Sequence, residues 1–264
     1  MLATLTMLAF AHVLADFVLQ SRAMVARKHR RAVLLRHTAI VGTTAFVALA
    51  AWTPGALIAV AVVTLAHAGI DAAKLALARR ARHPFAALRL FGADQCAHLL
   101  SLGIVAALLP QAYAEGLWPA LLGSTAAQGL AAAAALVTGV IAATRVGDLM
   151  LAQLLAGIRH SRSAGSPGSA AGRAEDAGGA DELRAGAWIG WLERGLVFLF
   201  VLLGEFNAIG FVIAAKSILR FEYARDPAKS ELVIIGTLAS FGWAVLTALA
   251  TAAALDGLWP AGAG

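Results

Sequence analysis

The sequence has little charge and almost no cysteine. A single cysteine, Cys96, excludes an internal disulfide, a zinc ribbon and a Cys-pair redox motif. Charged residues make up 14% of the 264 residues, against about 25% in soluble domains, and 60% of the residues are hydrophobic. This composition excludes a disordered, collagenous or disulfide-rich secreted chain. With a mean hydropathy of +0.78, it predicts an all-α, polytopic helical membrane protein.

The sequence also lacks the common motifs of soluble enzymes. It contains no GxGxxG fingerprint, no P-loop, no GxSxG elbow and no internal repeat. The net charge of +6 could suggest a nucleic-acid partner, but the basic residues lie where a membrane topology requires them. We therefore expect no nucleic-acid binding and a membrane lipid as the partner.

Apolar stretches predict about seven or eight membrane spans. Six stretches are long enough to cross a hydrocarbon core, which takes about 17–25 residues. Residues 188–223 are apolar over a length that suits two short helices with a turn at 204–207, and these either cross the membrane twice or form a re-entrant hairpin. The six longer stretches are 2–20, 37–52, 55–78, 94–109, 118–144 and 232–255.

Basic residues predict the orientation of these spans. Lys and Arg are concentrated in the loops that follow the first and third spans, and they are absent from the connections at 53–54 and 110–117. Because such residues are retained on the cytoplasmic side, we expect an inner-membrane protein whose N-terminus is outside. Residues 159–186, rich in Gly, Ala and Ser, predict a flexible cytoplasmic linker. This linker divides an N-terminal membrane domain, 1–158, from the C-terminal membrane helices, 187–264.

Ionisable residues inside the predicted spans form three pairs. Each such residue costs at least about 2.5–3.5 kcal/mol on insertion scales, so it requires a partner or a function. The spacing within each pair is i,i+4, which places both side chains on one helix face, and all three pairs fall at a similar depth toward the cytoplasmic side. The pairs are His12 with Asp16, His67 with Asp71, and Asp94 with His98.

Three imidazoles and three carboxylates make a ligand set that suits zinc, manganese or iron. We therefore predict a divalent metal site built from these six residues. Lys74 is expected either to pair with Asp71 or to extend to the headgroups. Three other histidines, His29, His83 and His160, are assigned to solvent or headgroups. Four further residues are predicted to bind a substrate or an anion: Lys28, His37, Lys216 and Arg220.

Several sequence segments carry a resemblance to a known family. The first half contains residues 12–20 (HVLADFVLQ), 67–74 (HAGIDAAK) and 94–98 (DQCAH), and the second half contains 188–194 (WIGWLER), 215–221 (AKSILRF) and 235–240 (IGTLAS). In these segments the chain resembles the membrane family called domain of unknown function 3307, whose longer members the second half resembles. The family implies no established activity. A more distant likeness is to inner-membrane proteins described as metal-dependent hydrolases.

Three classes of function remain open at this point. The first is a metal-dependent membrane hydrolase that acts on a lipid-linked substrate or a phosphate ester at the inner leaflet. The second is a transporter that passes ions or is coupled to protons through the same His and Asp residues. The third is a non-catalytic scaffold in which the polar pairs only hold helices together.

Overall fold

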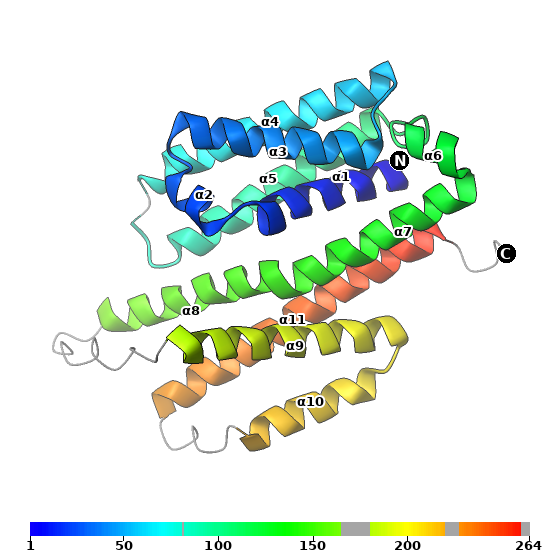
Figure 1. Cartoon of the computed structure of the whole chain (residues 1–264). Helices are drawn as coiled ribbons and strands as arrows, with labels where there is room; N and C mark the ends of the chain where they lie inside the picture. Colours follow the sequence, from blue (N-terminus) through cyan, green and yellow to red (C-terminus); the bar gives the residue numbers. More distant parts are fainter. Residues whose placement is uncertain (81, 165–179, 220–226, 260–264) are drawn as a thin grey trace. The chain divides into compact units, whose positions relative to one another are not determined.

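The computed structural model describes residues 1–80, 82–164, 180–219 and 227–259, which form helices joined by short connections (Figure 1). Seven helical stretches within this described part are long and apolar enough to cross a membrane. The predicted all-α, polytopic membrane class is therefore confirmed. The seven stretches are Leu2–Leu19, Arg31–Leu49, Pro54–Ala78, Ala86–Leu108, Ser124–Arg162, Gly186–Leu203 and Ser230–Leu258.

The chain divides into two compact units. Unit 1 comprises Met1–Ala81, Arg89–Ile141 and Thr251–Gly264, and unit 2 comprises Arg82–Leu88 and Ala142–Ala250. The predicted linker 159–186 lies within unit 2. Its flanks are helical, because α8 (Gly147–Ala164) and α9 (Ala180–Leu203) extend into them, whereas residues 165–179 lie outside the described residues.

The helices of unit 1 pack around α1. This helix contacts α3 and α7, and α3 also contacts α4. Small residues at these contacts allow close approach of the backbones, as is usual between membrane helices. The elements are α1 (Leu2–Leu14), the π-helical turn η1 (Ala15–Leu19), α2 (Arg22–Arg27), α3 (Arg31–Leu49), α4 (Pro54–Ala78), α5 (Ala86–Leu108), α6 (Leu117–Leu122) and α7 (Ser124–Ile141).

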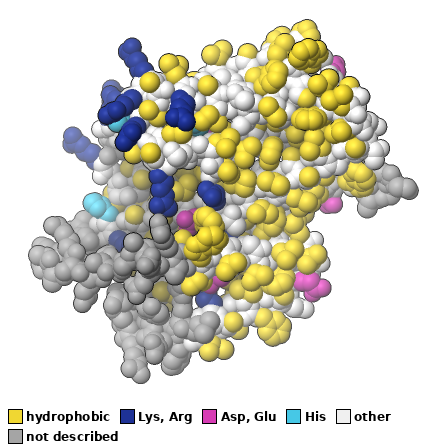
Figure 2. All heavy atoms as spheres, in the orientation of Figure 1, with side chains coloured by type: hydrophobic (Ala, Val, Ile, Leu, Met, Phe, Trp, Pro, Cys, Tyr) yellow, Lys and Arg dark blue, Asp and Glu magenta, His cyan; other side chains and the backbone are white. Residues whose placement is uncertain are grey.

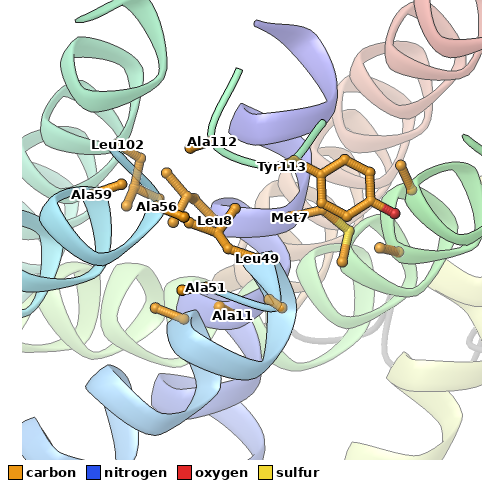
Figure 3. Close-up of a cluster of buried hydrophobic side chains, with 14 of the residues drawn as sticks. Met7, Leu8, Ala11, Leu49, Ala51, Ala56, Ala59, Leu102, Ala112 and Tyr113 are labelled. Carbon is orange, nitrogen blue, oxygen red and sulfur yellow. The ribbon is translucent and has the colours of Figure 1, made fainter. Parts of the chain in front are cut away.

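The core of unit 1 is apolar and rich in alanine. Leu8 of α1 is fully buried, and it lies in one cluster with Leu49 at the end of α3 and Leu102 of α5 (Figure 3). Tyr113 borders the same cluster and donates a hydrogen bond from its hydroxyl to the Ala127 carbonyl oxygen at 2.7 Å. Burial raises the pKa of Tyr113, so its phenol stays neutral as a donor. This core closes the unit at the end of α1 that is far from η1.

Tight connections hold the ends of α3, α4 and α6 together. Ala50 adopts a left-handed conformation with φ of +46° and ends α3, and Pro54 then occupies the first turn of α4. The backbone N–H of Leu117 donates to the Ala50 carbonyl oxygen at 3.1 Å. A Cβ on Gly116 would lie 2.2 Å from the Leu49 carbonyl oxygen, so this close approach requires glycine.

Two predicted span boundaries are wrong. The stretch 118–144 is interrupted, because Gly123 has a φ of +81° and separates α6 from α7. The helix that follows runs from Ser124 without a break through the π-helical turn η2 (Ala142–Val146) into α8. Asp94 does not open its span but lies about two turns inside α5. A helix satisfies its own backbone hydrogen bonds, so it can continue beyond its apolar run into the polar interface. The apolar run alone therefore does not mark where the helix begins or ends.

Unit 2 contains η2, α8, α9, α10 (Phe206–Leu219) and most of α11 (Pro227–Leu258). Val197 and Phe198 of α9 are buried in its apolar clusters. The predicted turn is confirmed at Gly204, where φ is +75°. With 14 residues, α10 is about 21 Å long and shorter than a hydrocarbon core of about 30 Å.

Large apolar side chains lie on the outside of both units. Leu108 in unit 1 and Phe211 in unit 2 are 74% and 78% exposed. Figure 2 shows hydrophobic side chains along the helices of unit 1, with Lys and Arg gathered near the end that carries α2. An outer surface of this kind suits contact with lipid tails, and the basic end suits the headgroups.

Candidate metal centre

The three predicted His/Asp pairs lie together inside unit 1. His12 comes from α1 and Asp16 from η1, whereas α4 contributes the second pair and α5 the third. The six side chains have little exposure, with exposed side-chain fractions between 2% and 8%, and Asp16 is the most exposed of them. Asp16 sits in the π-helical turn, a local widening of the helix that is frequent at functional sites. The structure therefore gathers the i,i+4 pairs of three helices at one place.

His37 joins this cluster from α3. It was predicted to bind a substrate or an anion, and the structure places its side chain inside the cluster with an exposed fraction of 0%. Its Nε2 atom lies 3.1 Å from Asp16 Oδ1 and 3.0 Å from His67 Nε2. The reason is that α3 begins at Arg31, so His37 lies nearly two turns inside the helix and faces its neighbours.

Three donor atoms of this cluster, from Asp16, His37 and His67, are spaced like ligands of one metal ion, and Asp71 lies beside the two imidazoles. His37 Nε2 and His67 Nε2 each lie within 3.6 Å of Asp71 Oδ2 and within 3.4 Å of Asp16 Oδ1. The two Nε2 atoms are 3.0 Å apart. A tetrahedral ion with bonds of about 2.0–2.1 Å separates its ligands by about 3.3–3.4 Å. Two imidazole nitrogens and the Asp16 oxygen at these distances would be held together by a cation between them.

A second group of donors is formed by Asp71, Asp94 and His98, which offer ligand atoms within 4.8 Å of one another. His98 Nδ1 lies 2.8 Å from the Asp94 carbonyl oxygen, which can only accept, so this nitrogen carries the proton and donates it. His98 Nε2 is then left with its lone pair, and it is buried without a hydrogen-bond partner in the part of the chain that is described. A backbone acceptor that orients an imidazole in this way is typical of metal-bound histidines.

A third group, His12, His67 and His98, connects the other two. The His98 ring centroid lies 4.7 Å from that of His12 and 4.3 Å from that of His67. His12 Nε2 lies 3.3 Å from Gln95 Oε1, and the Gln95 amide also donates to Asp94 at 3.0 Å. Gln95 therefore links the α1 and α5 parts of the cluster, a role that the sequence did not reveal.

Two lysines partly neutralise the carboxylates. Lys28 Nζ lies 2.6 Å from Asp71 Oδ2, and Lys74 Nζ lies 2.7 Å from Asp94 Oδ2. The predicted pairing of Lys74 with Asp71 is wrong, because Lys28 from α2 occupies Asp71 and Lys74 reaches across to α5. Three carboxylates against two ammonium groups leave one negative charge when the imidazoles are neutral. In a buried, low-dielectric site this excess favours a cation.

The other predicted site residues lie elsewhere. Lys216 is in unit 2, where its Nζ lies 2.5 Å from Glu193 Oε2, and Arg220 falls outside the described residues. The three histidines assigned to solvent or headgroups, His29, His83 and His160, are exposed as predicted. The sequence signal that could have placed His37 in the cluster is its position at the start of an apolar stretch, on the same side of the membrane as the three pairs.

These features define a multi-pass membrane protein with buried His and Asp side chains that could hold a metal ion. Residues 4–117 match the model of a family described as "Protein of unknown function (DUF3307)". The predicted resemblance is thus confirmed over the part of the chain that carries all seven donor residues. No curated protein and no solved structure matches the chain.

Proposed function

We propose that this protein is a metal-dependent membrane hydrolase that cleaves a phosphate ester, with a lipid-linked substrate at the inner leaflet. The observation that carries the proposal is the presence of two adjacent groups of three donors with no residue in common. One group is Asp16, His37 and His67, and the other is Asp71, Asp94 and His98. Three protein ligands per ion is the number found in catalytic zinc sites, where water completes the coordination.

Asp71 connects the two groups. Its Oδ2 atom lies 3.4 Å from His67 Nε2 in the first group, and its carboxylate also belongs to the second. A shared carboxylate supports two metal ions about 3.5–4 Å apart, an arrangement that clamps an in-line displacement at phosphorus. Water would add to phosphorus, and the bond between phosphorus and the alcohol oxygen would break. The products are the free alcohol and the phosphate.

The two lysines favour an anionic substrate. The Lys74 side chain is 35% exposed and the Lys28 side chain 11%, so Lys74 is the more accessible cation beside the donors. A phosphate that approaches the cluster would meet these ammonium groups first. The basic end of unit 1 supports the predicted placement of this face at the cytoplasmic leaflet, with the N-terminus outside and residues 159–186 in the cytoplasm.

Metal analysis together with an activity assay tests the proposal. The full chain, purified in detergent, is expected to contain up to two zinc, manganese or iron ions and to hydrolyse bis(p-nitrophenyl) phosphate or a short-chain phospholipid. Asp94→Asn is expected to lose most of this activity while the protein remains folded. Asp256→Asn is the matched control, because Asp256 is an exposed carboxylate of α11 in the same unit. Wild-type protein without bound metal would refute the proposal.

Transport is the second candidate function. The third donor group, His12, His67 and His98, overlaps with the other two, so a cation could pass from one group to the next. Uptake of zinc ions into proteoliposomes that depends on His12, without ester hydrolysis, would favour this function. A scaffold predicts instead that replacement of a whole His/Asp pair by apolar residues leaves both the fold and the phenotype unchanged.

A further inference from the structure

Arg194 of α9 is the largest fully buried side chain in the described part of the chain, with an exposed fraction of 2%. Its Nη2 atom donates to the Thr144 carbonyl oxygen at 3.1 Å, and its Nη1 atom donates to Ser240 Oγ at 3.3 Å. The Nε atom is buried and has no hydrogen-bond partner among the described residues. This guanidinium is therefore only partly satisfied by the protein around it.

The charge of Arg194 is also incompletely compensated. Its carboxylate partner, Asp148, lies 3.5 Å from Nη2 and has a side chain that is 42% exposed. By contrast, the neighbouring Lys216 and Glu193 form a close pair at 2.5 Å. A buried charge is costly unless it is closely paired and hydrogen-bonded. The arrangement around Arg194 thus has room for a further anion.

A cavity of about 300 Å³ lies beside this guanidinium, entirely within unit 2. This is the small end of the range for ligand pockets, so the cavity suits a compact group better than a whole lipid. Three basic side chains, Arg159, Arg194 and Lys216, and two acidic ones, Asp148 and Glu193, line the cavity, so its lining carries an excess of one positive charge. Its other walls include Ser240, Leu155 of α8 and Gly236 of α11. A Cβ on Gly236 would lie in ordinary van der Waals contact with Leu155 at 3.7 Å, so this position accepts a side chain without a clash.

We propose that this cavity binds a phosphate group, supplied either by inorganic phosphate or by the headgroup of a phosphatidic acid. The guanidinium of Arg194, which lines the cavity, would donate to a phosphate oxygen, because its charged N–H groups suit phosphate. Lys216 provides the second cation of the site. The site is separate from the metal centre of unit 1 and does not depend on hydrolysis.

Titration calorimetry on the full chain in detergent tests this site. The probes are inorganic phosphate and dihexanoyl phosphatidic acid, with dihexanoyl phosphatidylcholine as the ligand control. Arg194→Gln is expected to weaken binding about ten- to a hundredfold, which is the range for loss of charged hydrogen bonds. Arg162→Gln is the matched control, since Arg162 pairs with Glu231 at 2.5 Å in the same unit and does not line the cavity.

A second variant keeps the test decisive if Arg194→Gln fails to fold. Gly236→Val fills the cavity without changing any charge, and it is expected to weaken binding at least tenfold. Saturable binding of either probe supports the site, and the better probe identifies the source of the phosphate. The proposal is overturned if neither probe binds. It is equally overturned if Gly236→Val binds like the wild type, or if Arg162→Gln loses as much affinity as Arg194→Gln.

Discussion

Replacement of His37 by alanine is expected to weaken zinc binding by about two to three orders of magnitude. His37 Nε2 lies 3.1 Å from Asp16 Oδ1 and 3.0 Å from His67 Nε2, the other two donors of its group, and this is the spacing of ligands around one ion. Zinc in small structural sites contributes about 10–16 kcal/mol, which is about 2.5–4 kcal/mol for each of four ligands. Loss of one ligand therefore raises Kd by about 10²- to 10³-fold.

Competition with a chromophoric zinc chelator measures this change in the purified, detergent-solubilised protein. His29→Ala is the matched control, because His29 is exposed and lies outside the cluster. Circular dichroism shows whether each variant keeps its helix content. If His37→Ala binds zinc with the affinity and stoichiometry of the wild type, Asp16, His37 and His67 do not form a site and the reasoning fails.

Two further predictions concern the same unit. Lys28→Gln removes the ammonium group that lies 2.6 Å from Asp71 Oδ2, so this carboxylate becomes free to bind the metal. Zinc affinity should therefore rise about tenfold in the same chelator assay. A fall in affinity would mean that Lys28 supports the site. Gly116→Ala places a Cβ 2.2 Å from the Leu49 carbonyl oxygen and should lower the free energy of unfolding by about 1–3 kcal/mol in a thermal or denaturant melt. Gly103→Ala, with nothing within 4 Å of its Cβ, should be neutral or stabilising, and equal losses in both variants would contradict the close approach at Gly116.

The predictability of the candidate site differs from residue to residue. His67 and Asp71 were found from sequence because i,i+4 spacing on a helix places both on one face whatever surrounds them. His37 has no partner on its own helix, so only the packing of α3 against α1 and α4 shows that it belongs to the cluster. Lys74 was expected to pair with Asp71 or to extend to the headgroups, and neither alternative named its partner, because Asp94 lies on another helix.

The fold, like the candidate site, was predictable from the sequence only in part. The apolar runs identified the spans, because a membrane helix needs a minimum length of apolar residues. Their ends were less predictable, since helix continuity depends on local backbone conformation, as at Gly123, and on packing beyond the apolar run. The burial of Arg194 also could not be predicted from the sequence, because its hydrogen-bond partners Thr144 and Ser240 are 50 and 46 residues away.

The sequence by itself determined that this is a helical membrane protein and that three helices each carry a histidine and a carboxylate on one face. Both properties follow from composition and from the helical repeat, which act within a single segment. Only the tertiary structure decided which donors share a group, which lysine pairs with which carboxylate, and where a buried guanidinium borders a cavity. These features depend on the contacts between helices, and a helical repeat does not specify which neighbour a face will meet.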